Sequence, residues 1–277
     1  MATCAALPEL HPDDRPLIRE LERRDVFVEG VVWDSAQGTE LDAVMLRSVW
    51  DYHLRVEEFL TWVGRFRDSR TFWNSAALVS WNAKKTYLRD LAARGVATVD
   101  TLWLEERDLP RAEALIHERG WGEIVVKPAV SASAHDTHRF TAARRAEALA
   151  HARALAQRGI AMVQPYLDSV EGYGERSFIF VDGEYTHGVQ RQAVLSKPFE
   201  SEAPAPRVEP TTAEFALCAA TLAALDETPL YARVDIAPDA QGTPRLMELE
   251  LIEPRLYFRE APASAARMAD TLASRLT

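Results

Sequence analysis

The sequence predicts an α+β protein in which an α/β N-terminal lobe precedes two lobes built on antiparallel sheets. Up to about residue 80, short apolar runs such as Ala43–Leu46 alternate with stretches of helical spacing such as Val56–Phe66, as expected for a parallel sheet covered by helices. Further along, Asp182-Gly183 separates two strand-like runs, Ser177–Val181 and Glu184–Gln190, and this dipeptide is a strong signal for an antiparallel hairpin.

The other elements follow from apolar periodicity and from residues that end helices. Gly95, Gly120 and Gly159 each follow a helical stretch, where glycine commonly caps the C-terminus. The predicted helices are Pro12–Leu21, Val56–Phe66, Lys84–Arg94, Pro110–Arg119, Thr141–Gln157, Thr212–Leu225 and Pro262–Leu276. The further predicted strands are Val26–Trp33, Ala43–Leu46, Val96–Val99, Ile124–Val126, Ile160–Val163, Leu230–Ile236 and Arg245–Leu251. The Pro-rich stretch Lys197–Pro210 is predicted to be an exposed loop.

Composition limits the classes of function. The chain has 277 residues, of which 47% are apolar, and carries a net charge of −10, which argues against a nucleic-acid partner but allows a local pocket for a small anion. No apolar run approaches the ~20 residues that span a bilayer. We find no signal peptide, and we read Cys4 and Cys218 as reduced thiols of a cytoplasmic protein. Dimers are common among soluble proteins, so a homodimer stays an open expectation.

The last predicted hairpin brings acidic residues together. If its turn centres between Gln241 and Gly242, Asp235 faces Glu248 and Arg233 faces Glu250. Facing like charges destabilise a sheet, and a cation between them would reverse that effect. Three carboxylates without His or Cys select Mg²⁺ or Mn²⁺ over zinc. The alternative is a structural pair of Arg233 with Glu250, with the other two acids in solvent.

Other candidate residues lie at the ends of strands and helices. Lys127 ends an apolar strand before a loop of small residues, Ser131–Ala134, whose backbone could close over phosphates, although solvent exposure explains that lysine equally simply. Lys85 lies near a predicted helix start, where a cation opposes the helix dipole. The stretch Gln164–Leu167 reads as a crossing between lobes or as an edge-strand end. His135 and His138 are expected to be solvated loop residues.

In their order along the chain, these motifs resemble those of the ATP-grasp superfamily. The order is a lysine near a helix start, V-V-K-P before a small-residue loop, Q-P-Y-L, G-E-x-S, D-G, R-x-D and E-x-E. The resemblance is finer to glutathione-synthetase-like members that include the cyclo-ligase group forming D-cycloserine. It rests on L-R-S-x-W-D-Y at Leu46–Tyr52, W-N-x-K-K-x-Y-L at Trp81–Leu88 and M-E-L-E-x-I-E-P at Met247–Pro254.

The resemblance implies a division of the chain and roles for particular residues. Residues 1–80 would form a substrate domain, 81–163 a small lobe and 164–277 a large lobe with the metal, with ATP bound between the two lobes. Lys85, Lys127 and the loop with Ser131 and Ser133 would contact the ATP phosphates. Residues Gln164, Pro165, Tyr166 and Leu167 would hold adenine, with Glu175 near the ribose. Asp235, Glu248 and Glu250 would hold Mg²⁺, and Glu250 stands where most members have Asn. Arg233 would stabilise the transferring phosphate, and Arg47, Trp50, Asp51 and Tyr52 would face the substrate.

The function implied by the resemblance is ATP-dependent joining of a small-molecule carboxylate to an amine, on amino acids or small peptides, through an acyl phosphate. Two alternatives remain within the same class of fold, an intramolecular cyclo-ligase and a small-molecule kinase. A third, of another class, is a nucleotide-binding protein without catalysis.

Overall fold

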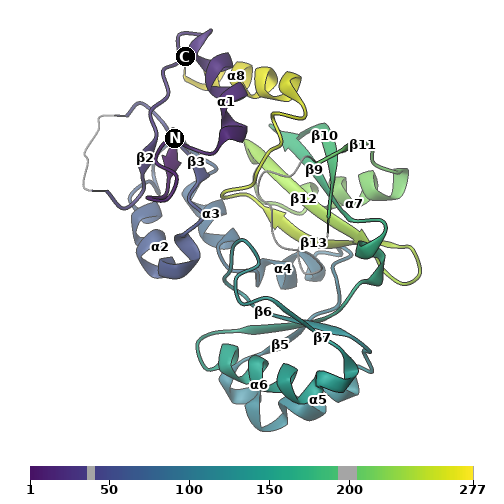
Figure 1. Cartoon of the computed structure of the whole chain (residues 1–277). Coiled ribbons are helices and arrows are strands. Elements are labelled where there is room, and N and C mark those ends of the chain that lie inside the picture. The colour runs from purple at the N-terminus through teal and green to yellow at the C-terminus, as the bar shows by residue number, and fades with distance from the viewer. Residues whose placement is uncertain (36–40, 193–204, 277) are drawn as a thin grey trace.

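The computed structural model describes residues 1–35, 41–192 and 205–276, and its strands form three sheets (Figure 1). The four-stranded N-terminal sheet has the order β2-β1-β3-β4 and is parallel throughout. Its strands are β1 (Ala2–Thr3), β2 (Val31–Val32), β3 (Val44–Ser48) and β4 (Phe72–Trp73). Helices α2 (Val56–Gly64) and α3 (Ala76–Asn82) share an apolar core with this sheet. The predicted strand Val26–Trp33 is thus reduced to β2.

The second and third sheets are antiparallel, so the predicted α+β class is confirmed. The second sheet has the order β5-β8-β6-β7, from β5 (Leu102–Leu104), β6 (Ile124–Pro128), β7 (His138–Phe140) and β8 (Ala161–Pro165). Helices α5 (Ala112–Glu118) and α6 (Arg145–Ala156) cover one of its faces (Figure 1).

The third sheet contains both predicted hairpins and has the order β11-β10-β9-β12-β13. Its strands are β9 (Glu175–Val181), β10 (Glu184–Arg191), β11 (Arg207–Val208), β12 (Tyr231–Pro238) and β13 (Pro244–Glu250). Helix α7 (Thr212–Ala223) packs against β12 and β13. The division of the chain into three domains stays a prediction, although the sheets occupy successive stretches of sequence.

Three further predicted elements differ from the structure. The helix expected over Lys84–Arg94 begins only at Tyr87, as α4 (Tyr87–Ala93), so Lys85 lies in the turn after α3. The strand expected at Val96–Val99 is an irregular segment in which Thr98 makes a single bridge to Leu246. The loop expected over Lys197–Pro210 contains the short strand β11, and its part within residues 193–204 lies outside the described residues.

Beyond the bridge at Leu246, the outer edge of β13 is held by side chains. Asn82 Nδ2 donates to Leu249 O at 2.9 Å, and Asn82 Oδ1 accepts from Leu251 N at 3.0 Å. Tyr87 Oη accepts from Leu249 N, also at 3.0 Å. Both side chains are buried, so they satisfy backbone groups that water cannot reach. These bonds place β13 and its glutamates relative to α3 and α4.

The first helix packs against the last one. Helix α1 (Arg15–Glu22) and helix α8 (Pro262–Leu276) lie side by side (Figure 1). Leu17 and Leu21 of α1 share one buried cluster with Met268 and Leu272 of α8 and with residues of the third sheet. The segment that leads into the N-terminal sheet is therefore joined to the far end of the sequence.

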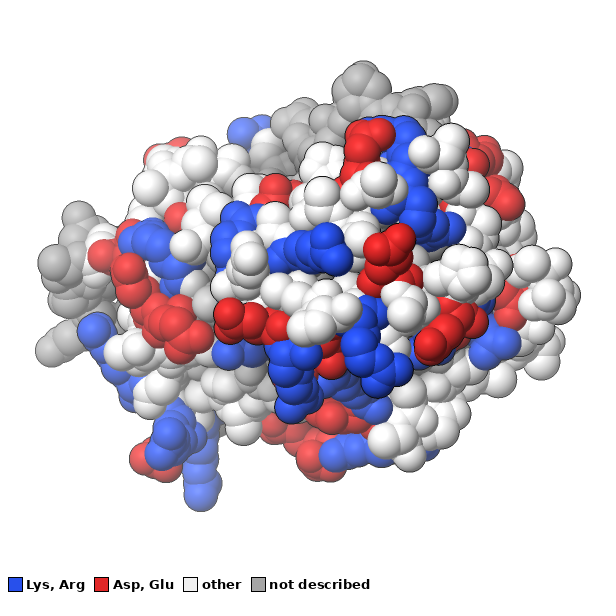
Figure 2. Space-filling model, turned by 90° about the horizontal axis from the view of Figure 1, so that it is seen from below, with Lys and Arg blue, Asp and Glu red and all other residues white. Residues whose placement is uncertain are grey.

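The cysteines and the surface can be described for residues 1–35, 41–192 and 205–276. Cys4 and Cys218 are both buried free thiols. On the face that lies below in Figure 1, basic and acidic side chains are interspersed (Figure 2). In residues 1–35, 41–192 and 205–276, no helix is both long and apolar enough to cross a bilayer.

We expect the substitution Asn82→Ala to lower the free energy of unfolding by about 2–5 kcal/mol, because it leaves two buried backbone groups of β13 without partners. Urea denaturation followed by tryptophan fluorescence measures this. Ser80→Ala, an exposed change two residues earlier in α3, is the matched control and should cost less than about 0.5 kcal/mol. Equal losses for the two variants would contradict the role of Asn82.

Candidate active site

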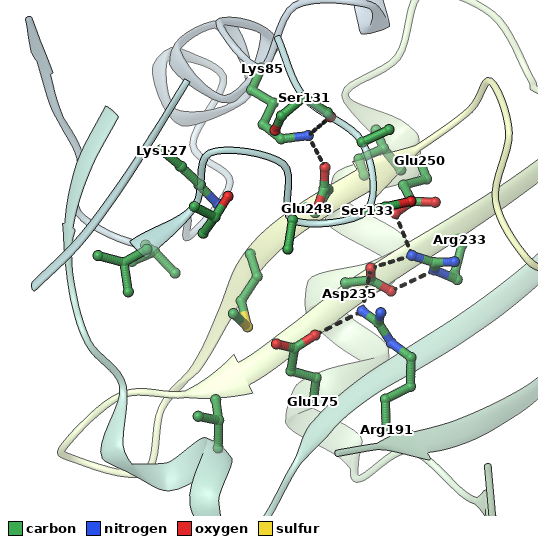
Figure 3. A pocket seen from close by; sticks show the side chains of 18 of the residues that line it. Lys85, Lys127, Ser131, Ser133, Glu175, Arg191, Arg233, Asp235, Glu248 and Glu250 are labelled. Carbon is green, nitrogen blue, oxygen red and sulfur yellow. Dashed lines mark hydrogen bonds and ion pairs between the residues drawn. The ribbon is translucent and has the colours of Figure 1, made fainter. Parts of the chain in front are cut away.

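A cavity of about 450 Å³ is lined by residues of the second and third sheets and by Trp50 and Tyr52 of the N-terminal lobe. One part of its wall is apolar and includes Val125, Val170 and Met247. All four residues of the predicted adenine-binding stretch, Gln164 to Leu167, line the cavity. The other part of the wall is strongly charged (Figure 3).

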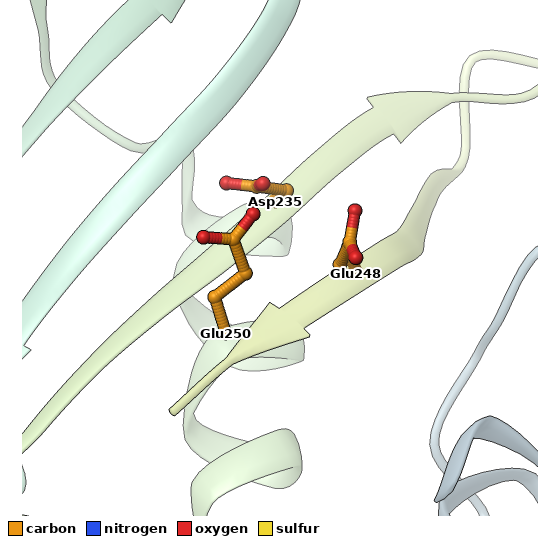
Figure 4. Close-up of side chains that lie close together, drawn as sticks. All are labelled: Asp235, Glu248 and Glu250. Carbon is orange, nitrogen blue, oxygen red and sulfur yellow. The ribbon is translucent and has the colours of Figure 1, made fainter. Parts of the chain in front are cut away.

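The three predicted metal-binding carboxylates converge in the charged part (Figure 4). Asp235 comes from β12, and Glu248 and Glu250 from β13, and one oxygen of each lies within 4.8 Å of the others. Asp235 pairs with Glu248 and Arg233 with Glu250, as predicted. The register nearer the turn differs, since Ile236 pairs with Leu246.

Met247 explains that difference in register. It is the extra residue of a bulge between the pairs Asp235–Glu248 and Ile236–Leu246. The turn is centred half a residue earlier than predicted, and the bulge compensates for this shift before the carboxylates are reached. The predicted facing pairs are therefore correct, although the assumed turn was not.

Two arginines neutralise the carboxylates of β12 and β13. Arg233 donates to both oxygens of Asp235 at 2.9 Å and also to Glu250. Arg191, at the end of β10, contacts Asp235 Oδ2 at 2.7 Å and Glu175 at 2.9 Å. Burial raises the pKa of Asp235, but the facing charges of Arg191 and Arg233 outweigh burial and lower this pKa to about 2. Asp235 is therefore ionised at neutral pH.

The two predicted phosphate-binding lysines differ in their partners. Lys85 Nζ contacts Glu248 and donates to Ser131 O at 3.0 Å, while Lys127 makes no hydrogen bond or ion pair with the described residues. Burial lowers the pKa of Lys127, and Glu248 offsets this effect only in part. Lys127 is a cation held in the wall of a cavity without a counterion, so it favours an anionic ligand.

The loop after Lys127 supplies the two predicted serines to the cavity. Ser131 and Ser133 both line it. Ser133 and Ala134 have φ values of 50° and 56°, in the left-handed region that glycine adopts most easily. The predicted phosphate loop thus has a glycine-type backbone without glycine, at a conformational cost of about 1 kcal/mol or more per residue.

Two of the four predicted substrate residues lie elsewhere. Arg47 is 3% exposed and does not line the cavity, and its guanidinium pairs with Asp14 at 2.8 Å. Asp51 accepts a hydrogen bond from Trp33 Nε1 at 2.8 Å and is likewise not among the residues that line the cavity. Trp50 and Tyr52 do line the cavity. Local sequence patterns did not show that Arg47 has a buried partner, Asp14, which is 33 residues away in sequence.

Arg191 and Glu253 line the cavity but were not among the residues predicted for the site, and neither was Arg255. Arg191 follows the first hairpin, and only its register opposite Glu175 could have pointed to the site. Glu253 lies just beyond β13 and was part of a recognised motif, but no role followed from it. Both positions depend on where the irregular segments after β10 and β13 run.

The chemistry of the carboxylate cluster fits a hard divalent cation. All its ligand groups are carboxylates, and one oxygen of each lies close enough to the others to share an ion. Arg233 contacts two of these three carboxylates, Asp235 and Glu250. The geometry therefore supports both the metal-site hypothesis and the predicted Arg233–Glu250 pair.

We expect a specific pH dependence of stability from Glu250. Burial, which Arg233 offsets only in part, raises the pKa of Glu250 from 4.5 to about 7. A raised carboxyl pKa stabilises the fold below the unfolded pKa, and this contribution is lost as the pH rises through the folded pKa. In magnesium-free buffer, the unfolding free energy of Glu250→Gln should therefore rise relative to wild type between about pH 5 and pH 8.

The control for this measurement is Glu184→Gln, an exposed change at the first residue of β10. It should show no pH-dependent difference from wild type. A constant offset between Glu250→Gln and wild type across the same pH range would mean that Glu250 does not titrate there.

Comparison with known proteins places the whole chain beside one biosynthetic enzyme. Residues 1–74 match the model of the D-cycloserine synthetase DcsG N-terminal domain. The chain is 31% identical over 291 residues to the cycloserine biosynthesis protein DcsG of Streptomyces lavendulae, covering 95% of this chain and 94% of the relative. The crystal structure of D-cycloserine synthetase DcsG matches with a TM-score of 0.90 and 29% identity, over 100% of this chain and 98% of that one.

A more distant similarity shows the fold alone. D-alanine–D-alanine ligase from Bacillus anthracis, in its complex with ATP, matches with a TM-score of 0.69 and 15% identity. The match covers 99% of this chain and 95% of the ligase. The arrangement of lobes around the cavity is thus shared with a nucleotide-bound protein.

Proposed function

Since this chain belongs to the D-cycloserine synthetase family of ATP-grasp ligases, we propose that it uses ATP to phosphorylate a carboxylate and then joins this carboxylate to an amine. The observation that carries the proposal is the cavity itself. Its apolar part suits a nucleobase, and its charged part combines Lys85, Lys127 and Arg233 with three carboxylates. A nucleotide-binding protein without catalysis would not need this set of lysines, arginine and carboxylates.

The chemistry follows from the poor leaving group of a carboxylate. One carboxylate oxygen attacks the γ-phosphorus of ATP, the bond to ADP breaks, and an acyl phosphate forms. The amine nitrogen then attacks the carbonyl carbon, phosphate leaves with the electron pair of its C–O bond, and the nitrogen loses a proton. Such phosphoryl transfer depends on positioning and on neutralising charge.

The residues divide this work by position. Lys127, which has no counterion in the described chain, binds the ATP phosphates together with Lys85 and the loop containing Ser131 and Ser133. Arg233 stabilises charge on the transferring phosphoryl group. The stretch Gln164–Leu167 receives adenine, and Glu175 binds near the ribose. Mg²⁺ held by Asp235, Glu248 and Glu250 would neutralise the triphosphate charge.

A ring-closing version of this reaction is the second candidate. The relative with 31% identity is named for cycloserine, whose ring contains a bond between a carbonyl carbon and a nitrogen. In that version the carboxylate and the nitrogen belong to the same molecule, and no separate amine is required. The TM-score of 0.90, against 0.69 for the ligase that joins two molecules of D-alanine, favours it.

We expect Lys127→Ala and Glu248→Ala each to reduce ATP turnover at least about 100-fold, because each removes a charge that acts on the transferring phosphate or its cation. Lys127→Ala should keep the wild-type melting temperature to within a few degrees, since the Lys127 side chain has no partner to lose. Glu248→Ala should lower the melting temperature, because it removes the ionic partner of Lys85. ADP release and differential scanning calorimetry measure the two effects.

Lys84→Ala is the matched control for these variants. Lys84 neighbours Lys85 in sequence but is exposed and faces Glu57 at 3.6 Å. Its removal should leave turnover unchanged. Turnover near the wild-type level in Lys127→Ala or Glu248→Ala would remove that residue from the proposed site.

The reaction itself is tested by ADP release with Mg-ATP and a panel of amino acids and their derivatives, singly and in pairs, with product masses recorded. A product equal to two substrates minus water establishes joining of two molecules. A product that forms from one compound establishes ring closure if its mass is lower than that of the compound. It establishes kinase activity if its mass is higher by one phosphoryl group. Failure of Mg-ATP to bind would contradict the proposed function.

A further inference from the structure

The loop that follows Lys127 is fixed by hydrogen bonds at its beginning (Figure 3). Lys85 N donates to Ala129 O at 2.7 Å, and Lys85 Nζ donates to Ser131 O at 3.0 Å. Both bonds come from the turn after α3. Neither of them involves Ser133, which lies in the middle of the loop.

The end of the loop is held from α6 and the residues that follow this helix. His151 Nε2 lies 2.9 Å from Asp136 O, and Arg158 Nη2 donates to Asp136 Oδ2 at 3.0 Å. Between the two anchors, Ser133 and Ala134 have φ values of 50° and 56°, which side chains other than glycine rarely adopt. Such a backbone persists only where its surroundings hold it in place.

The N-terminal lobe contacts the middle of the loop at two points. The rings of His53 and His135 have centroids 5.1 Å apart and planes inclined by 52°. His53 belongs to the short helix η2 (Tyr52–Arg55), and its Nδ1 lies 2.9 Å from Trp50 O, which fixes the direction of the ring. Ala132 packs against the apolar core that the N-terminal sheet shares with α2 and α3. The loop is thus joined to a lobe that does not contain it.

Packing, and not charge, holds the two rings together. Burial lowers the pKa of His53. The charge of Asp51 and the bond to a backbone oxygen oppose this shift, and the charges of His135 and Lys85 reinforce it. Since an unperturbed histidine already loses its charge at about pH 6.5, the His53 ring is neutral at neutral pH. A neutral ring meets its neighbour without the repulsion that acts between two cations.

We propose that His53 and His135 are positioning residues, whose ring contact holds the middle of the phosphate loop, with Ser133, over the cavity. The inference rests on the proposed function, in which this loop binds the ATP phosphates. Neither histidine lines the cavity, so both act through the loop and not by touching the nucleotide. Loss of the contact weakens the hold on the outer phosphates and leaves the adenine-binding stretch unchanged.

The test measures the Kd of Mg-AMPPNP, a non-hydrolysable ATP analogue, by calorimetry at neutral pH. We expect His53→Ala and His135→Ala each to raise this Kd about three- to tenfold, the range that one ring pair contributes. The double variant should match the single ones, because the contact can be lost only once. His135→Phe keeps a ring at this position and should stay within about twofold of wild type.

Two controls separate the loop contact from other effects. His117→Ala removes an exposed histidine of α5 and should leave the Kd unchanged. AMP, which lacks the outer phosphates, should bind wild type and His135→Ala equally. All variants should keep the wild-type melting temperature, since both rings lie outside the four large buried clusters of the described chain.

An unchanged Kd in His135→Ala overturns the inference. It is also overturned if the losses in the two single variants add up in the double variant, because two independent residues would behave in that way. An equal loss in His135→Phe and His135→Ala has the same meaning, since the ring would then contribute nothing. A wild type that does not bind Mg-AMPPNP contradicts the proposed function itself.

Discussion

The candidate site depends on how the edge of β13 is held. An edge strand exposes a row of unpaired backbone groups and is free to shift by a residue, which would turn its side chains to the opposite face. Here Asn82 bonds to Leu249 and Leu251, and Tyr87 bonds to Leu249. These contacts come from the turn region that also carries Lys85. The same short segment thus sets the register of the glutamates and presents the lysine that faces one of them.

Within that frame, electrostatics distinguish ligands from supports. Asp235 is surrounded by two guanidinium groups and stays ionised, whereas Glu250 lies in a poorly solvated position that favours its protonated form. Lys127 is a charged residue whose side-chain partner the described chain does not supply. A cavity that holds such a cation in its wall suits an anionic ligand such as the ATP phosphates. Pairing inside the protein thus separates the groups that organise the site from those that receive ligands.

The sequence predicted the fold class and several local placements, and the roles of the site residues stay predictions. Residues close in sequence or opposed in a hairpin were found, because strand alternation and turn chemistry relate them directly, as for Asp235 and Glu248. Arg47 was misplaced because its partner, Asp14, comes from a distant segment, and Arg191 was missed because only tertiary packing brings it to Asp235. Helix α3 was not predicted, and the helix predicted from Lys84 begins in the structure only at Tyr87. Long-range pairing of charges is what local patterns do not contain.

The contact between α1 and α8 affects how the chain emerges from the ribosome. Leu17 and Leu21 are translated well before Met268 and Leu272, which share their buried cluster. Until those later residues are translated, the apolar face of α1 has no complete partner. A growing chain therefore exposes this face until α8 has been made, and an exposed apolar face favours association.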